Sequence, residues 1–233
     1  MEGNVVLTMR DISKTFPGVK ALQHVDFTLR KGEIHALMGE NGAGKSTLIK
    51  LLDGEEIPNS GTVMVENINV GKLKHSRVPV YRRNIGVVFQ DYRLLPRLTI
   101  FENIAFALEV IGMKKVDIRR RVREVLELVS LEDKAKAFPN ELSGGQQQRA
   151  TIGRAIANHP KVLIADEPTG NLDPDKSAEI MELLEKINEV EKTTVVMVTH
   201  DSTIVDRFKK RTICLEEGYV VADIMKGGYL KHD

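Results

Sequence analysis

A glycine-rich loop between an apolar strand and a helix constrains this chain more than any other feature. The loop reads GENGAGKST over residues 39–47, which matches the P-loop pattern of glycine, four residues, then Gly-Lys-Ser/Thr. The apolar run 34–38 before it predicts a buried strand, and the run 48–52 after it predicts the first turns of a helix. A strand, a glycine loop and a helix in this order are typical of a site for a nucleoside triphosphate such as ATP.

The residue types in the loop indicate how it would bind phosphate. Glycines allow main-chain N–H groups to curl around phosphate oxygens, and the N-terminus of the helix adds a favourable dipole. Lys45 is expected to reach the β- and γ-phosphates, and the Ser46 hydroxyl to ligate Mg²⁺. The nucleotide-binding residues predicted in this loop are Gly39, Asn41, Gly42, Ala43, Gly44, Lys45, Ser46 and Thr47.

The composition suits one large α/β domain without disulfides. The chain has 233 residues, 42% of them hydrophobic, and its 34 basic and 33 acidic residues leave a net charge of +1. This balance does not favour nucleic acid or anionic lipid as a partner. Cys214 is the only cysteine, so an intrachain disulfide is excluded. We see no signal peptide and no apolar run near the ~20 residues that span a bilayer, and expect membrane association only through a partner.

Apolar runs that alternate with helical patterns predict a mostly parallel sheet covered on both faces. Further strands of this core are predicted at 85–89, 162–165, 194–198, 212–216 and 219–224, and helices at 175–190 and 202–208. A small antiparallel sheet is predicted from strands at 4–9, 25–30 and 62–66.

After residue 99 the apolar residues recur at the three- to four-residue spacing of a helix, which predicts a helical insertion. We therefore expect a single domain over 1–233. Its catalytic core with the β subdomain would comprise 1–90 and 158–233, and a helical subdomain would occupy 91–157.

Two basic stretches allow more than one interpretation. Residues 71–83 carry lysines, arginines and a histidine but no acid, which indicates a solvated loop or a surface that faces phospholipid head groups. The run Arg119-Arg120-Arg121 falls within a predicted helix, and we interpret it as mostly the solvated face.

The apolar strand at 162–165 ends in two carboxylates, Asp166 and Glu167. In P-loop enzymes an acid at this strand end helps to hold Mg²⁺, which is the role expected of Asp166. Glu167 is expected to polarise the attacking water. An acidic turn after a core strand is the structural alternative, and the P-loop favours the catalytic interpretation.

A second glycine-rich motif, LSGGQ at residues 142–146, precedes a predicted helix over 144–157. Ser143 and two glycines at a helix N-terminus make a second anion-binding end, which one nucleotide does not need. Here the sequence resembles the ATP-binding cassette (ABC) ATPases, whose signature motif is LSGGQ. The resemblance covers nearly the whole chain, and the motifs occur in the family's order. It implies a P-loop NTPase (RecA-like) core of α/β class.

The resemblance assigns roles to single residues. Phe16 resembles the aromatic residue that stacks on adenine, although an isolated Phe is more often part of a core. Gln90 looks like the glutamine that senses Mg²⁺ and the membrane partner, and Asp173 belongs to a segment similar to the D-loop. His200 matches the switch histidine at the γ-phosphate, where a lone histidine would usually be structural.

In this family two chains bury two ATP molecules between them, head to tail. Hydrolysis opens the closed dimer, and the opening drives a membrane subunit. The resemblance therefore implies a homodimer in the ATP-bound state, an integral membrane subunit, a peripheral location on the cytoplasmic side of the membrane, and no direct contact with nucleic acid. It adds to the nucleotide-binding residues Ser143, Gly144, Gly145, Gln146 and Asp173. The expected catalytic residues are Glu167, His200, Lys45 and Gln90, and the expected Mg²⁺ ligands are Ser46, Gln90 and Asp166.

Two branches of the family are visible in the chain. Residues from about 71 to 229 resemble the FtsE group of cell-division ATPases, which implies an FtsX-like permease as the partner. Residues from about 5 to 50 look more like sugar-importer ATPases, which motivates the hypothesis of a hybrid chain. The alternatives are the ATPase of another importer or exporter, of lipoprotein-release, macrolide or sugar type, a soluble ABC protein acting on ribosomes or DNA, and a nucleotide-binding scaffold without turnover.

Replacing Glu167 by Gln is expected to abolish turnover while trapping an ATP-bound dimer, because the water loses its base while the contacts to ATP remain. Size-exclusion chromatography of the variant with saturating ATP checks this. A variant that stays monomeric would contradict the dimer mechanism.

Overall fold

The computed structural model describes residues 5–225, and Asn4 of the first predicted strand lies outside them. The chain divides into two compact units. The first comprises residues 1–82 and 194–233, and the second comprises residues 83–193. The predicted helical subdomain lies within the second unit, whose limits are wider than 91–157. Each unit is described by itself.

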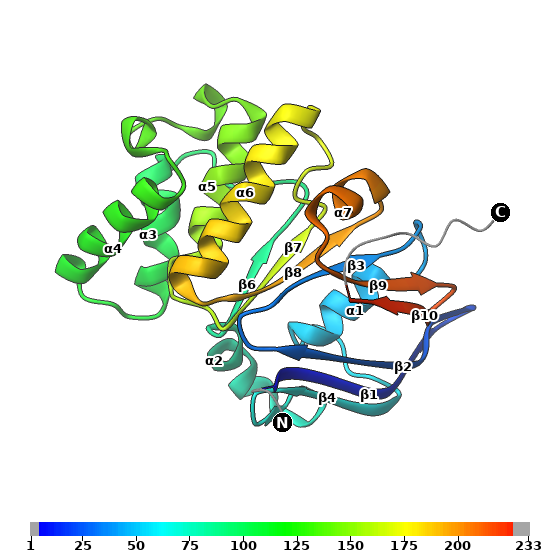
Figure 1. Cartoon of the computed structure of the whole chain (residues 1–233). Coiled ribbons are helices and arrows are strands. Elements are labelled where there is room, and N and C mark those ends of the chain that lie inside the picture. The colour runs from blue at the N-terminus through cyan, green and yellow to red at the C-terminus, as the bar shows by residue number, and fades with distance from the viewer. Residues whose placement is uncertain (1–4, 226–233) are drawn as a thin grey trace. The chain divides into compact units, whose positions relative to one another are not determined.

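An antiparallel sheet forms one part of the first unit (Figure 1). In the described residues its strand order is β2-β1-β4-β5, with β1 at Val5–Phe16, β2 at Val19–Arg30, β4 at Ser60–Val65 and β5 at Ile68–Asn69. The three predicted strands are present and antiparallel, and β1 and β2 are longer than expected. The two-residue strand β5 was missed because it is too short to carry an alternating pattern.

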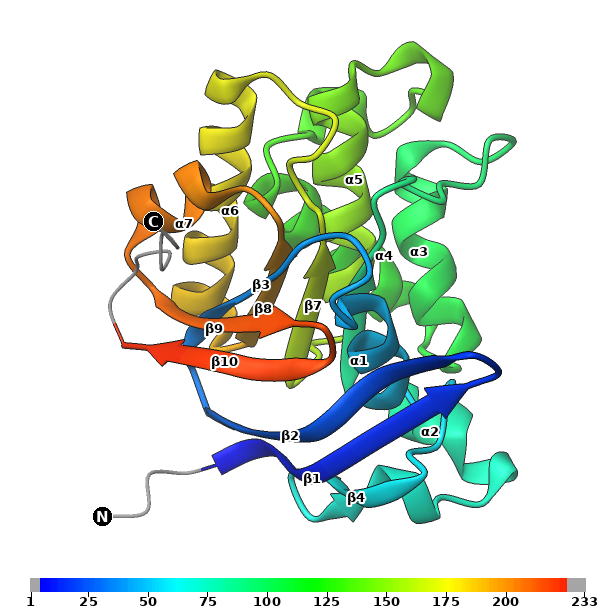
Figure 2. The same cartoon turned by 90° about the vertical axis from the view of Figure 1, so that its right-hand side faces the viewer.

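The other strands described in the first unit lie side by side in the order β10-β9-β3-β8 (Figure 2). β3 (Ile34–Met38) is parallel to β8 (Thr194–Thr199) and to β9 (Arg211–Glu216), and β10 (Tyr219–Ile224) returns antiparallel to β9. Every residue of β8 is buried, as expected of a strand covered on both faces. Cys214 on β9 is also buried, and burial raises the pKa of its thiol.

The α-helices described in the first unit are α1 (Lys45–Leu52), α2 (Val78–Arg82) and α7 (Ser202–Phe208). The expectation of a loop over 71–83 was incomplete, because this stretch contains α2 and the 3₁₀ turns Val70–Lys72 and His75–Arg77. Tyr81 anchors α2, because its ring is buried and its hydroxyl donates to the Leu52 carbonyl. The lysine and arginine side chains of the stretch are exposed.

In the second unit, β6 (Ile85–Val88) is parallel to β7 (Val162–Asp166). The described helices are α3 (Ile100–Val110), α4 (Lys115–Leu128), α5 (Gly144–Ile156) and α6 (Pro174–Glu191), and the 3₁₀ turns Glu132–Lys134 and Pro139–Glu141 lead into α5. The predicted apolar faces of α3 and α4 are buried, as at Ile104 and Val122. Over residues 5–225, no helix combines the length and apolar character needed to cross a bilayer.

Arg121 corrects the expectation of a solvated arginine run on α4. Arg119 and Arg120 are exposed, but Arg121 is only 7% exposed. Its guanidinium donates to the carbonyl oxygens of Ile156 and Ala157 at the end of α5, at 3.0 and 2.9 Å, and to the Glu191 carboxylate at 2.9 Å. Burial raises the pKa of Glu191, but the hydrogen bonds and charges of Arg121 and His159 together outweigh it and leave this pKa below its ordinary value. Arg121 therefore caps one helix and neutralises a shielded carboxylate.

Replacing Arg121 by Met is expected to lower the free energy of unfolding by about 3 kcal/mol, because two carbonyls lose their donor and the Glu191 carboxylate keeps only His159 as a partner. Urea denaturation measures the change, with the exposed Arg120→Met as the control at about 0.5 kcal/mol or less. The difference should shrink as the pH falls below the ordinary glutamate pKa of 4.5, because a carboxyl with a lowered pKa stabilises the fold only while ionised. An equal effect of both substitutions would contradict the capping role.

Candidate nucleotide-binding site

The P-loop of the first unit is packed so closely that two of its glycines have no room for a side chain. A Cβ atom at Gly39 would lie 2.5 Å from the carbonyl oxygen of Leu215 on β9. A Cβ atom at Gly44 would lie 2.4 Å from the carbonyl oxygen of Ala21 on β2, and Gly44 also has a φ of +104°. The main chains of β2 and β9 thus hold the loop in the open curve that phosphate oxygens require.

Helix α1 begins directly after this loop with its first turn available to an anion. Its N-cap is Gly44, no side chain caps it, and no acidic residue lies in its first turn. The first N–H groups of a helix otherwise need a side-chain acceptor, water or a ligand. The uncapped turn and the close-packed loop fit the phosphates of a nucleotide.

Lys45 lies at the start of α1 and is buried. Its Nζ donates to the carbonyl oxygen of Gly39 and, at 3.4 Å, to that of Glu40. The ammonium is therefore directed back along the loop, where it would meet the oxygens of a bound phosphate. Ser46 is exposed beside it, and Ala43 is buried beneath the loop.

Phe16 and His200 are the other predicted residues of the first unit. Phe16 ends β1 and is half-buried, with the Lys14 ammonium 5.1 Å from the centre of its ring. A partly exposed ring can still stack on a base, so its role stays a prediction. His200 follows β8 and is exposed, and the next residue, Asp201, caps α7 by accepting from the Thr203 N–H at 2.8 Å.

The predicted carboxylates lie in the second unit at the end of β7, and both are half-buried. Asp166 is the last residue of the strand, and Glu167 has a φ of +47°. This left-handed conformation is unfavourable for a glutamate and costs roughly 1 kcal/mol, as is often seen where a side chain must be aimed for function. The N–H of Gly170 donates to the Glu167 carbonyl at 3.1 Å and stabilises the turn.

Gln90 lies close to the segment that follows Glu167 in the same unit. The Gln90 carbonyl accepts from the Asn171 side chain at 3.4 Å. A Cβ atom at Gly170 would lie 3.4 Å from the Gln90 Nε2 atom and 3.6 Å from the Glu167 Cβ atom. The structure therefore brings together two predicted functional residues, Gln90 and Glu167, that are far apart in the sequence.

The LSGGQ motif forms the N-terminus of α5 through a capping box. The Ser143 Oγ accepts from the Gln146 N–H at 3.4 Å, and the Gln146 side chain accepts from the Ser143 N–H at 3.0 Å. Gln146 thus stabilises the helix end, a role that the sequence interpretation did not assign to it. A Cβ atom at Gly144 would lie 3.2 Å from the Tyr92 hydroxyl oxygen, and one at Gly145 would lie 3.2 Å from the Lys176 side chain.

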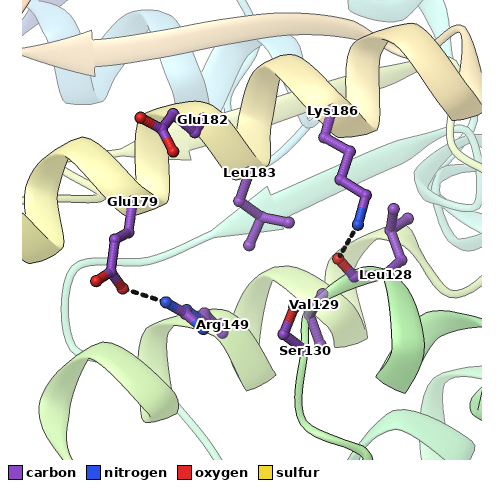
Figure 3. Close-up of a pocket in the computed structure, with 8 residues that line it drawn as sticks. All are labelled: Leu128, Val129, Ser130, Arg149, Glu179, Glu182, Leu183 and Lys186. Carbon is purple, nitrogen blue, oxygen red and sulfur yellow. Dashed lines mark hydrogen bonds and ion pairs between the residues drawn. The ribbon is translucent and has the colours of Figure 1, made fainter.

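Asp173 caps α6 and pairs with Lys176. Its carboxylate accepts from the Lys176 N–H at 2.9 Å and from the Lys176 ammonium at 2.6 Å, and this side-chain hydrogen bond lowers the pKa of Asp173. Further along the two helices, Arg149 of α5 pairs with Glu179 of α6, beside a surface pocket (Figure 3). The sequence did not predict that Tyr92 and Lys176 lie against Gly144 and Gly145, because such contacts between distant residues leave no motif in the sequence.

Comparison with known proteins identifies the family. The family model described as ABC transporter matches residues 22–170. The chain belongs to this family. The cell division ATP-binding protein FtsE of Bacillus subtilis (strain 168) is 51% identical over 229 residues, which cover 98% of this chain and 100% of that protein. FtsE of Escherichia coli (strain K12) is 45% identical, with 92% and 97% covered.

A solved structure has the same fold. It is a dimeric ATP-binding cassette in a post-hydrolysis state bound to ADP and Pi, with a TM-score of 0.85 and 37% sequence identity, covering 96% of this chain and 100% of that chain. The predicted α/β P-loop fold, the ABC resemblance and the likeness to the FtsE group are confirmed. The hybrid origin stays a hypothesis, because one identity over the whole aligned length does not compare residues 5–50 with residues 71–229.

Replacing Gly44 by Ala is expected to lower the free energy of unfolding by roughly 2 kcal/mol or more and to abolish nucleotide binding, because the new methyl group meets the Ala21 carbonyl. Gly42→Ala is the matched control. Gly42 has a φ of +91°, but no atom lies within 4 Å of the position that a Cβ would take there, so about 1 kcal/mol is expected. Urea denaturation and titration with a fluorescent ATP analogue measure both effects. Equal losses for the two variants would show that conformation, not close packing, decides the result.

Proposed function

We propose that this chain is the ATP-binding and ATP-hydrolysing subunit that powers a membrane protein complex in cell division. The match to FtsE proteins over nearly the whole chain carries the proposal. A methionine import ATP-binding protein of Listeria monocytogenes is 42% identical over 93% of this chain, which leaves import as the second candidate. The higher identity to the division proteins favours the first.

The first unit would hold the nucleotide. The Lys45 ammonium and the uncapped N–H groups of α1 would bind the phosphates, and the Phe16 ring would stack on the adenine. The Ser46 hydroxyl would ligate Mg²⁺, and His200 would contact the γ-phosphate. The support for these roles is the shape of the loop and the direction of the Lys45 side chain.

The second unit would supply the chemistry of hydrolysis. Asp166 and Gln90 provide oxygen atoms of the kind that Mg²⁺ prefers, and Glu167 would act as general base toward water. Within residues 5–225 no group of three or more His, Cys, Asp or Glu side chains forms a metal site. In P-loop enzymes the nucleotide's own phosphate oxygens provide part of the Mg²⁺ coordination.

The working form would be a homodimer in the ATP-bound state. Ser143, Gly144 and Gly145 at the N-terminus of α5 would contact the γ-phosphate of the ATP that the partner holds, with Asp173 beside them. The dimeric state of the solved cassette supports this arrangement. The membrane subunit would be an FtsX-like permease, and the chain would lie peripherally on the cytoplasmic side of the membrane.

Phosphate release tests the enzymatic part of this proposal. The purified chain is expected to release phosphate from ATP in the presence of Mg²⁺ and to stop when EDTA removes the metal. Lys45→Ala should lower the rate roughly 100-fold or more, because the developing charge on the phosphate loses a donor. A wild-type chain that binds ATP without releasing phosphate would indicate a scaffold.

Copurification tests the partner. The tagged chain, purified from detergent-solubilised membranes of its native cells, is expected to carry an FtsX-like permease. Recovery of the permease of a methionine importer in its place would favour the second candidate.

A further inference from the structure

The segment directly after Gln90 has a backbone conformation that its residues disfavour. Tyr92 has a φ of +57° and Arg93 a φ of +49°, so two consecutive residues lie in the left-handed region. Neither is glycine, asparagine or aspartate, which are the residues that tolerate this region best. Such a conformation persists only when surrounding contacts hold it.

Helix α5 supplies contacts to both strained residues. Arg154 donates from Nη2 to the Tyr92 carbonyl at 3.0 Å and from Nη1 to the Arg93 carbonyl. The Thr151 hydroxyl lies 3.1 Å from the same Tyr92 oxygen and 2.9 Å from the Gln147 oxygen, and its one proton serves one of the two at a time. The planar fork of Arg154 is therefore the main hold on the segment.

Side chains of the segment also contact one another, and one of them makes a second contact with α5. The Arg93 guanidinium lies 3.8 Å from the centre of the Phe89 ring and donates from Nε to Asp91 at 3.0 Å. The Tyr92 hydroxyl lies against Gly144, at the other end of α5. One residue of the loop thus touches both the LSGGQ motif and the last turn of the same helix.

We propose that Arg154 is a positioning residue, which holds the loop carrying Gln90 in its strained conformation on the helix that carries the LSGGQ motif. Gln90 is two residues from Tyr92, so the Arg154 hold determines where the Gln90 side chain lies. The effect on magnesium described below rests on the proposed function, in which Gln90 is a Mg²⁺ ligand. The structural part of the proposal does not depend on it.

Arg154→Lys removes the fork, because an ammonium is a compact donor that cannot reproduce the planar two-carbonyl geometry. Amide hydrogen exchange of the peptide over residues 88–98 should accelerate roughly tenfold relative to the α3 and α4 peptides. The Mg²⁺ concentration for half-maximal phosphate release should rise severalfold, with a smaller change in the rate at saturating Mg²⁺.

Arg93→Gly relieves the left-handed strain but also removes the contacts of Arg93 to Phe89 and Asp91, so it is made in the wild-type chain as well. Arg154→Lys should then change both readouts less in the Arg93→Gly background than in the wild-type chain, because less strain is left for the fork to hold. The effect of a residue that merely stabilises α5 would be the same in both backgrounds. Thr151→Val, which removes a hydroxyl at nearly constant volume, replaces Arg154→Lys if the latter does not fold; smaller changes in the same direction are expected.

Arg121→Lys is the matched control, since Arg121 is another α-helical arginine that donates to two carbonyls and none of its hydrogen bonds reaches the loop. It should lower thermal stability and leave both loop exchange and magnesium dependence unchanged. If Arg154→Lys behaves like this control, or if it accelerates loop exchange as much in the Arg93→Gly background as in the wild-type chain, the positioning role is wrong. If the wild-type chain releases no phosphate, the proposed function fails, while hydrogen exchange still decides whether Arg154 holds the loop.

Discussion

The close approach of main-chain atoms around the P-loop is the constraint on which the candidate site depends. The carbonyl oxygens of Ala21 and Leu215 occupy the space that side chains at Gly44 and Gly39 would need. The loop follows β3, which lies between β8 and β9, and it precedes α1, whose first turn has no side-chain cap. Backbone atoms thus shape the proposed phosphate cradle, and Lys45 would add the positive charge inside it.

In the second unit, backbone conformation is strained at and near two candidate site residues, Glu167 and Gln90. Glu167, Tyr92 and Arg93 all have left-handed conformations that side chains disfavour. In each case a nearby donor stabilises the turn: a glycine N–H at Glu167, and the arginine of α5 at the other two. Strain of this kind is found where a loop must aim a side chain, and here it occurs at the proposed base Glu167 and close to Gln90.

Much of the fold and the site could be predicted from the sequence because the relevant signals are local. The P-loop, the carboxylates after β7 and the LSGGQ motif are contiguous stretches, and buried parallel strands read as apolar runs. What could not be predicted depends on contacts between distant residues. Arg121 lies in a run of arginines that looks solvated, and only the ends of α5 and α6 explain its burial. The helix at Tyr81 and the conformation of Tyr92 likewise depend on a carbonyl or an arginine elsewhere in the same unit.

The buried position of Cys214 has a practical consequence. It is the only cysteine in the chain, it lies within a strand, and its raised pKa disfavours the reactive thiolate. A thiol placed at an exposed position, such as a residue of the loop after Gln90, would therefore react with a spectroscopic label far faster than Cys214. Distance measurements with such a label would therefore need no substitution of Cys214.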